Sequence, residues 1–454
     1  MTKTLAQWVA TSRRLPDDGR AMMAARHALL DWTGVALTGA GAQATRIIAA
    51  DLVQDAPEGV CCLVGQSGRT NAPFAAMING VASHVLDFDD INKAMRGHPS
   101  VTIIPAVLAM AGQLDTDCRA LLEAIVIGTE AACHVGAMMG ADHYEAGWHT
   151  TATVGTIGAA AGVSRLLGLD PKQTEMAIGI AATQAAGLKL MFGTMCKPLH
   201  AGKAAMSGLL SARWAAAGLD SAEDALEAPF GFGPVLSTGF AAAPVPAMPG
   251  ETYAIEANIY KFHAACYYTH SAIEALRSLV RDHAPEPAKI AQIEVRVPRQ
   301  HLNVIGIKAP RTGLEAKFSV SWLLASVLMG IDTSDPRVFD GNLTARADLA
   351  AMAARVVVLG DAFDSRTAST VCLRLDDGAE LCCSLDVGLP QSDFRRQSDL
   401  LSRKFLSLAS AMLGPMRADA LNRQILNLDS GTSARAFGAA LSPAQGGPEQ
   451  KVIS

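Results

Sequence analysis

The sequence predicts a mostly helical fold with a smaller inserted α+β lid, and three observations lead to this prediction. The chain has 454 residues, of which 50% are hydrophobic and 18% charged, so it is long enough for two or three globular cores. Apolar residues recur at helical spacing up to about residue 285, whereas strand-like alternation appears between 290 and 388. Helical spacing then returns at 398–413. We therefore expect a large all-helical domain built from both chain ends, residues 1–269 and 396–454, and an α+β lid domain over 270–395.

Seven helices are predicted in the first half, at 20–37, 71–86, 99–114, 116–139, 151–167, 171–188 and 199–218. Three of them carry start signals, namely Asn71 with Pro73, Pro99, and Asp170 with Pro171. Small residues such as GTIGAAAG at 155–162 allow helices to approach closely. These features indicate a compact bundle with a largely buried centre.

The predicted lid begins with a strand at 290–298, followed by a helix at 314–328 and a second strand at 354–361. Residues 371–388 read as two strands around Asp376-Asp377-Gly378, a sequence typical of a hairpin turn. The final stretch, 430–454, loses helical periodicity, and we expect its end to be a loose tail.

Composition argues against several classes of partner. The net charge is −5 and basic residues are scattered, so neither nucleic acid nor an anionic membrane is an expected partner. The beginning of the chain lacks an apolar signal core, and no uncharged run reaches membrane-spanning length. The low charged fraction favours surface hidden in a subunit interface, so we expect a homodimer.

Cysteine usage is typical of a reducing cytoplasm. The nine cysteines include no CxxC motif and no metal-ligand spacing. Two adjacent pairs, Cys61-Cys62 and Cys382-Cys383, fit strand residues better than a disulfide framework. We therefore predict a cytoplasmic protein.

Three cationisable side chains stand where helices are predicted to begin: His98 before Pro99, His149 before Thr150, and Lys197 before Pro198. A cation at that position opposes the helix dipole, at a cost of roughly 0.3–1 kcal/mol. The same field lowers the pKa of a histidine or lysine, and helix N-termini bind carboxylates. If the three helix starts converge, they form an anion pocket ringed with proton carriers. Taken singly, a residue of this kind is more often a solvated surface side chain.

The segment HVLDFDD (84–90) places Asp87, Asp89 and Asp90 at the end of a predicted helix, where acids oppose the dipole. A hard-cation site needs more oxygen ligands than this segment offers, so no metal is expected. Two interpretations remain: a polar transition from helix to loop, or an Asp87 that orients a catalytic histidine or lysine.

Seven segments together resemble the MmgE/PrpD family in order and spacing, over nearly the whole chain. They are HVLDFDD, GHPS (97–100), HTTATVGTIGAAAGVSRLLGL (149–169), CKPLHAGKAA (196–205), EAKFSVSW (315–322), ALLDWTGVALTG (28–39) and FHAACYYTHSAIEA (262–275). The resemblance implies a helical domain made from both chain ends, an inserted α+β lid and a dimer. It also implies action on a small polycarboxylate without metal or organic cofactor. Family members dehydrate 2-methylcitrate, decarboxylate cis-aconitate or epimerise iminodisuccinate.

The resemblance also assigns residues to the active site. Asp87, His98, His149 and Lys197 match positions tied to catalysis in the members that decarboxylate cis-aconitate, and Tyr144 is similar to a tyrosine proposed as a proton carrier in epimerisation. The chain departs from the decarboxylating members at Ile91 and Trp322, which replace Thr and Tyr, and its loop before His98 is one residue longer. It also lacks the bulkier Trp-containing loop of the members that dehydrate 2-methylcitrate.

The shared chemistry is abstraction of a proton next to a carboxylate. Lys197, His98 and helix N-termini can stabilise the resulting negative charge. His149 or a neutral Lys197 can act as base, and His98 or Tyr144 as proton donor. We predict a cofactor-independent lyase of dehydratase type. The alternatives are an epimerase or isomerase of an aspartate-derived dicarboxylate, and a non-catalytic carboxylate-binding relative.

Four further residues are predicted to bind substrate: His263, Lys203, Trp322 and Arg311. Arginine suits two-point contact with a carboxylate. His263 lies near the expected domain junction but could equally be a core histidine. The same two interpretations, core residue or substrate contact, apply to His84, His134, His200 and Cys266.

Overall fold

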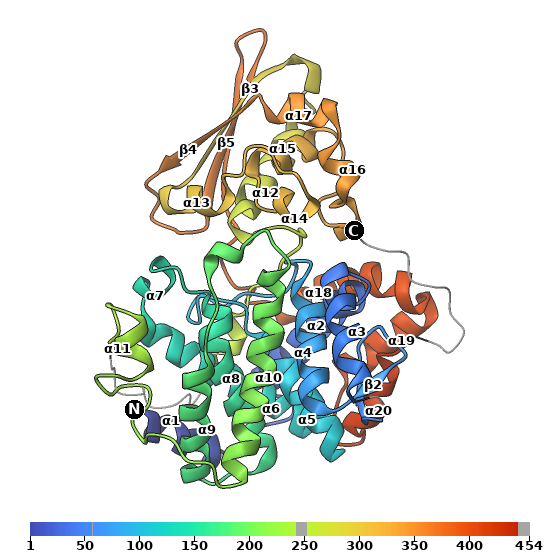
Figure 1. Cartoon of the computed structure of the whole chain (residues 1–454). Helices are drawn as coiled ribbons and strands as arrows, with labels where there is room; N and C mark the ends of the chain where they lie inside the picture. Colours follow the sequence, from blue (N-terminus) through green and yellow to red (C-terminus); the bar gives the residue numbers. More distant parts are fainter. Residues whose placement is uncertain (57, 242–251, 444–454) are drawn as a thin grey trace.

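The computed structural model describes residues 1–56, 58–241 and 252–443. It shows a larger helical domain with a smaller, sheet-containing domain stacked on one end (Figure 1). The larger domain contains α1 (Thr2–Thr11), α2 (Arg20–Gly39), α3 (Gln43–Gln54), α4 (Ala72–His84), α5 (Ser100–Leu114), α6 (Cys118–Met139), α7 (Asp142–Glu145), α8 (Thr150–Leu167), α9 (Pro171–Gln184), α10 (Cys196–Ala216), α11 (Phe232–Leu236), α18 (Phe394–Leu413), α19 (Pro415–Leu426), α20 (Ala434–Ala440) and the short strands β1 (Cys61–Cys62) and β2 (Arg69–Thr70). The predicted fold class, mostly helical with a smaller α+β part, is confirmed.

Close helix packing positions the functional residues, because α10 lies directly against α4 and α8. A Cβ atom added to Gly80 on α4 would lie 2.7 Å from the Cα of Gly202 on α10. Only glycine at this crossing lets the two helices touch through their backbones. The contact brings the end of α4 next to the beginning of α10.

One described helix, α6, is long and apolar enough to cross a membrane, with a mean hydropathy of 1.4 over its most apolar window. Since 89% of that window is buried inside the structure, packing in the protein core accounts for its composition.

The smaller domain has one mixed sheet with helices on one face. Its elements are α12 (His270–His283), β3 (Ile290–Pro298), α13 (Leu302–Ile305), α14 (Gly313–Ala316), α15 (Val320–Leu328), α16 (Gly341–Thr344), α17 (Ala347–Ala353), β4 (Val356–Asp361), β5 (Ala368–Leu375) and β6 (Glu380–Asp386). The strand order is β4-β3-β5-β6, with β3 parallel to β4 and antiparallel to β5. Helix α12 packs against β5 and β6, and α15 against β4. Alternate residues such as Val295 and Val371 are therefore buried beneath the helices.

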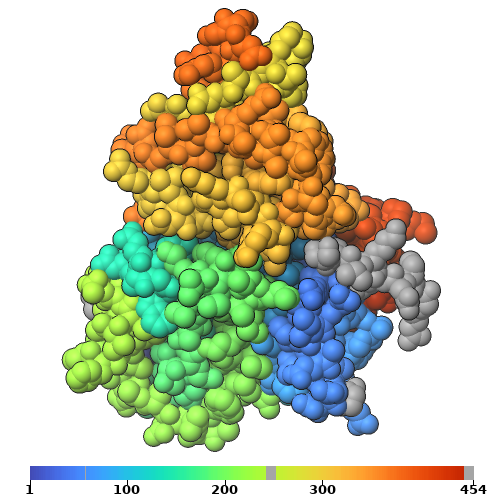
Figure 2. All heavy atoms as spheres, turned by 45° about the horizontal axis from the view of Figure 1, so that its top comes forward, coloured from blue at the N-terminus to red at the C-terminus, as the bar shows by residue number. Residues whose placement is uncertain are grey.

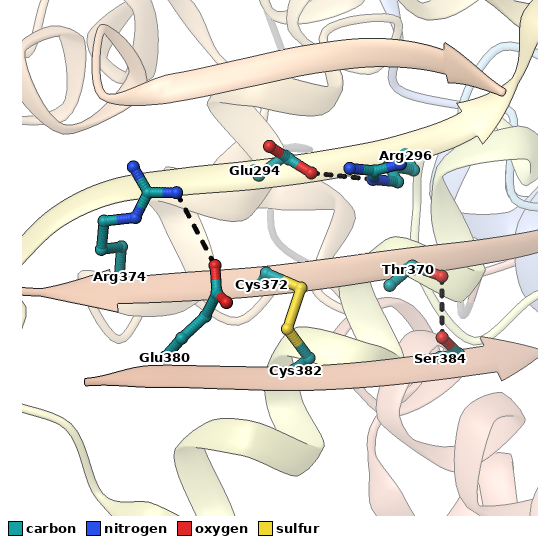
Figure 3. The surroundings of a disulfide bond; sticks show 8 residues. All are labelled: Glu294, Arg296, Thr370, Cys372, Arg374, Glu380, Cys382 and Ser384. Carbon is teal, nitrogen blue, oxygen red and sulfur yellow. Dashed lines mark hydrogen bonds and ion pairs between the residues drawn. A yellow bond between two sulfur atoms is a disulfide. The ribbon is translucent and has the colours of Figure 1, made fainter. Parts of the chain in front are cut away.

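The opposite sheet face carries a disulfide between Cys372 and Cys382 (Figure 3). These two residues are direct partners in the β5–β6 register, with Cα atoms 4.1 Å apart. The prediction that Cys382 is a strand residue is confirmed, but the expectation that it takes no part in a disulfide is wrong. The partner is fixed by the hairpin register, which cysteine spacing alone does not reveal.

Several predicted boundaries need correction. The predicted helix 314–328 is two helices, α14 and α15, because Lys317 turns inward between them and Ser319 caps α15 by accepting from Trp322 N. Helix α9 ends at Gln184, before residue 188. Helix α10 begins at Cys196, so Lys197 lies in its first turn rather than before it.

The predicted loss of helical structure over 430–454 is also wrong in part, since α20 lies there; residues 444–454, the expected loose tail, lie outside the described residues.

The two domains share buried apolar contacts. One hydrophobic cluster combines Val81, Val85 and Phe88 from the larger domain with Leu323 and Ile293 from the smaller one. Burial of this surface holds the small domain against the end of α4. Figure 2 shows the yellow and orange atoms of the small domain resting on the green, teal and blue atoms of the larger domain.

Candidate active site

A cavity of about 600 Å³ lies between the two domains. Its walls come from the segment after α4, the starts of α8 and α10, and α7 on the larger domain, together with several loops of the smaller domain. The structure brings all five residues predicted as catalytic to this cavity: Asp87, His98, Tyr144, His149 and Lys197.

Asp87 holds two lysines at the bottom of the cavity. Its Oδ1 forms an ion pair with Lys197 Nζ at 2.9 Å and accepts a hydrogen bond from Lys261 Nζ at 2.6 Å, and none of the three side chains is more than 7% exposed. Burial opposes ionisation of Asp87, but the two ammonium groups outweigh it and hold the pKa of Asp87 well below its usual value. The same attraction raises the pKa of Lys261 despite burial of that side chain. The result is a compensated cluster of one carboxylate and two ammonium groups.

The backbone around Asp87 is held by three buried lysines. Asp87 has a φ of 51°, in the left-handed region that a non-glycine residue adopts only at a cost. Three consecutive carbonyl oxygens accept from lysine ammonium groups: Leu86 from Lys317 at 2.5 Å, Asp87 from Lys261 at 2.8 Å, and Phe88 from Lys404 at 2.7 Å. Lys317 lies in the small domain, Lys261 in the segment that connects the two domains, and Lys404 on α18. We call this arrangement the lysine clamp.

The clamp residues differ in their electrostatic surroundings. Burial lowers the pKa of Lys317 to about 7, although Asp87 partly opposes this shift. Lys404 also bonds Asp31 Oδ1 at 2.7 Å, and burial raises the pKa of Asp31 to about 6. The clamp therefore concentrates positive charge around the carboxyl end of α4, where the helix dipole is negative.

Asp89 lies between two imidazoles. Its Oδ1 is 3.0 Å from His84 Nδ1 and its Oδ2 is 2.7 Å from His98 Nδ1. Burial lowers the pKa of His84 to about 4 and also lowers the pKa of His98, so both rings are neutral near pH 7. Their Nδ1–H groups hold the pKa of Asp89 well below its usual value, even though burial opposes ionisation. Each ring therefore carries its proton on Nδ1.

This tautomer leaves Nε2 of His98 as a free lone pair. His98 Nδ1 is also 3.0 Å from the carbonyl oxygen of Asp90, which can only accept. Because two acceptors fix the proton on Nδ1, the Nε2 atom is a base. His98 itself borders the cavity.

A second histidine pair lies next to the first. His149 occupies the N-cap position of α8 without a capping side-chain hydrogen bond, and its Nδ1 is 3.0 Å from His200 Nδ1, so one ring must donate to the other. The ring centroids of His98 and His149 are 6.4 Å apart. Burial lowers the pKa of His149 well below its usual value and that of His200 to about 4. Neutral imidazoles thus line this wall of the cavity.

Tyr144 on α7 supplies a proton donor. Burial raises the pKa of Tyr144 well above its usual value, and Tyr268 adds to the shift, so the phenol stays protonated at neutral pH. The Lys189 ammonium lies 3.8 Å from the centroid of the Tyr144 ring and bonds its carbonyl oxygen at 2.9 Å. These contacts fix the position of α7 at the cavity edge.

The four residues predicted to bind substrate lie elsewhere. His263 bonds Glu274 Oε1 at 2.7 Å and Thr333 Oγ1 at 2.9 Å, outside this cavity. Lys203 donates to the carbonyl of Gln184 at 2.6 Å. Trp322 is buried in the small domain, where Nε1 donates to the Lys308 carbonyl at 3.3 Å. Arg311 has an 85% exposed side chain that pairs with Glu315. None of the four borders the cavity.

Several cavity residues were missed by sequence reasoning, above all Lys261, Tyr268, Arg96 and Arg366. One signal was available for Lys261, a lone charge in the apolar run YKFHAACYY (260–268). Arg96 and Arg366 come from polar loops, where nothing in the local pattern distinguishes them.

One group of side chains in the described part of the chain has metal-ligand geometry. The candidate ligand atoms of His84, Asp87, Asp89 and His98 lie within 4.8 Å of one another. Lys197 and Lys261, however, already bond Asp87, and each histidine directs a proton at Asp89. A cation would meet two ammonium groups and compete with those protons, so this donor set does not fit a metal ion. That catalysis needs no metal stays a prediction.

Comparison with known proteins gives two family matches that together span most of the chain. The MmgE/PrpD N-terminal domain matches residues 3–244, and the MmgE/PrpD C-terminal domain matches residues 263–430. A cis-aconitate decarboxylase from Aspergillus terreus is 25% identical over 94% of this chain and 93% of its own length.

Two other relatives match over shorter stretches. A cis-aconitate decarboxylase-like protein from Aspergillus oryzae is 31% identical over 62% of each chain. Human cis-aconitate decarboxylase is 28% identical over 58% of this chain and 56% of its own length. Both matches span less than two thirds of either protein.

Proposed function

Because the chain belongs to the MmgE/PrpD family, we propose that it is a lyase of dehydratase type acting on a small di- or tricarboxylate. The relatives named cis-aconitate decarboxylase support a lyase acting on a tricarboxylate. The observation that carries the proposal is a neutral His98, fixed by Asp89 with Nε2 free, in the same cavity as the ammonium groups of Lys197 and Lys261. This arrangement combines a base with fixed positive charge, as abstraction of a proton next to a carboxylate requires.

In the proposed reaction, His98 Nε2 removes a proton from the carbon next to a substrate carboxylate. The electron pair of that C–H bond enters an enediolate, whose negative charge Lys197 and Lys261 stabilise. Collapse of the enediolate forms a carbon–carbon double bond and expels the hydroxyl of the neighbouring carbon. Tyr144, held protonated, supplies the proton with which this hydroxyl leaves as water. Here His98 acts as base, whereas the sequence favoured it as proton donor.

An epimerase of an aspartate-derived dicarboxylate is the second candidate. It is favoured by the presence of Tyr144 and Lys197 in one cavity but on different elements, α7 and α10. Removal of a proton by Lys197, which requires its neutral amine form, and return of a proton from Tyr144 invert a carbon without breaking another bond. The predicted homodimer and the non-catalytic alternative remain predictions.

Incubation with three classes of acid in deuterated water, followed by NMR, tests the proposal. Hydroxy-tricarboxylates, unsaturated tricarboxylates and aspartate-derived dicarboxylates form the panel. A dehydratase makes or consumes a double bond, whereas an epimerase introduces deuterium into an otherwise unchanged acid. Loss of turnover in His98→Asn, with turnover retained in the exposed control His283→Asn, supports the proposal. Turnover that survives His98→Asn, or no reaction with any acid, contradicts it.

A further inference from the structure

Two arginines border the cavity without an ion-paired acidic partner in the part of the chain that the structure describes. Arg96 lies in the loop between α4 and α5 on the larger domain, and Arg366 lies in the loop between β4 and β5 on the smaller domain. Within the described ranges, neither guanidinium takes part in a hydrogen bond or ion pair with another residue. Most other arginines have such a partner, as Arg311 and Arg119 do. An unpaired arginine that borders a cavity is available to a ligand.

The loop that carries Arg96 is fixed in place. Asn92 and Gly97 form a bridge with the Asn92 N–H donating to the Gly97 carbonyl at 2.9 Å, and the Asn92 side chain donates to Asn258 Oδ1 at 2.8 Å. Arg96 itself has a φ of 56°, in the left-handed region. Residues kept in this costly conformation cluster at ligand-binding positions. Asp87 has the same property, so both ends of this loop present a strained residue to the cavity.

The loop that carries Arg366 is fixed by its neighbour. Thr367 is buried, and its Oγ1 donates to Asp386 Oδ1 at 2.5 Å, while Ser271 Oγ donates to the Thr367 carbonyl. Arg366 is exposed, and its side chain can adjust to a ligand. One fixed and one adjustable arginine thus border the same cavity from the two domains.

The acidic side chains near the cavity do not pair directly with either arginine among the described residues, although Glu145 offsets part of the effect of Arg366 on the pKa of Arg96. Burial lowers the pKa of Arg96, and the charge of Arg366 lowers it further, so the two cations repel each other. Glu145, Asp364 and Asp386 also border the cavity, but within the described residues none of them lies within ion-pair distance of either arginine. Asp386 is already occupied by Thr367 and by the Gly388 N–H at 2.8 Å. An anion between the arginines would relieve this repulsion.

We propose that Arg96 and Arg366 form a second carboxylate subsite, separate from Lys197 and Lys261, so that the preferred substrate carries at least two carboxylates. This inference rests on the proposed function and names the residues that bind the second carboxylate of its substrate. The reacting carboxylate lies at the buried lysines, and a distal carboxylate accepts from the guanidinium groups. Because the arginines come from different domains, the distal carboxylate bridges them.

Calorimetric binding of propane-1,2,3-tricarboxylate, an unreactive triacid, tests the subsite independently of turnover. A hydrogen bond to a charged group contributes roughly 1.5–3 kcal/mol, which corresponds to about a tenfold to hundredfold change in Kd. We expect Arg96→Gln and Arg366→Gln each to weaken triacid binding about tenfold. Binding of butyrate, which has one carboxylate, should change less than twofold. The exposed Arg281→Gln, on α12 and paired with Asp282, is the matched control.

The outcomes separate this inference from the proposed function. Wild-type Kd in both glutamine variants, or no triacid binding by the unmodified protein, overturns the subsite. If turnover fails in the acid panel but the arginine variants still lose triacid affinity, the proposed function is wrong and the subsite stands. Since neither guanidinium has a hydrogen bond or ion pair to another described residue, both variants should keep the wild-type Tm. Arg96→Lys should recover part of the lost affinity, because it restores the charge without the two-point geometry.

Discussion

Replacement of Asp89 by asparagine tests the central electrostatic claim about the site. Asp89 is fully buried and its two carboxylate oxygens face two Nδ1–H groups, those of His84 and His98. An asparagine side chain offers one acceptor oxygen and one NH2 group in the same space. One imidazole must therefore either face the NH2 group as a second donor or move its proton to Nε2.

The structure indicates which ring changes and at what cost. His98 keeps a second acceptor, the Asp90 carbonyl at 3.0 Å, whereas His84 Nδ1 has Asp89 alone, and His84 Nε2 is buried without a partner. If His84 moves its proton to Nε2, it buries an unsatisfied donor, which costs about 1–3 kcal/mol. The remaining bond to His98 loses its charge assistance, roughly another 1 kcal/mol. We expect Asp89→Asn to lower the free energy of unfolding by about 2–4 kcal/mol.

Denaturant unfolding measures this loss, and ¹⁵N NMR of the imidazoles reports which nitrogen of His84 carries the proton. Asp90→Asn is the matched control at pH 6, because burial raises the pKa of Asp90 to about 8 and the substitution then removes no charge. If Asp89→Asn destabilises the protein no more than this control does, and His84 keeps its Nδ1 proton, the bridging role assigned to Asp89 is refuted.

Three further predictions concern stability and helix packing. First, because the pKa of Asp90 is raised, the folded state holds a proton that the unfolded state releases near pH 4. The free energy of unfolding should therefore fall as the pH rises from 4 toward 8. Unfolding measured across pH 4–8 should show wild-type protein losing up to about 1.4 kcal/mol per pH unit relative to Asp90→Asn; parallel curves would contradict this. Second, Lys404→Met leaves Asp31 buried without its partner and should lower the free energy of unfolding by about 3–5 kcal/mol at pH 8. The loss should be smaller at pH 5, where Asp31 is protonated. An equal loss at both pH values would refute the pairing. Third, Gly80→Ala should cost about 1–3 kcal/mol and reduce turnover, because its Cβ would meet the Gly202 Cα at 2.7 Å; unchanged Tm and turnover would show that the helices can separate freely.

The helical domain could be predicted because its signals are local. Asn71 caps α4 by accepting from Phe74 N, and Asp170 caps α9, as the sequence indicated. The strand at 290–298 coincides with β3. Helices α14 and α15 were predicted as one helix. The break between them is caused by Lys317, which donates to the Leu86 carbonyl in the other domain, and the local sequence gives no sign of that contact.

The candidate site was predictable only in part. His98, His149 and Lys197 were found through their unusual position near helix starts, and the structure places them in one cavity. Their partners could not be found the same way, because Lys261 and Arg366 reach the cavity through tertiary contacts. The displaced predictions, Lys203 and Arg311, rested on residue type alone, and residue type does not say which way a side chain points.

The lysine clamp has a consequence for how the enzyme becomes competent. The strained turn at Asp87 lies early in the sequence. The lysines that donate hydrogen bonds to its carbonyl oxygens lie much later, at positions 261, 317 and 404. A chain truncated before Lys404 therefore lacks one of the three hydrogen bonds that hold the backbone on either side of Asp87, the carboxylate that pairs with Lys197 and Lys261. The geometry of this turn therefore depends on side chains from as far along the polypeptide as Lys404 on α18.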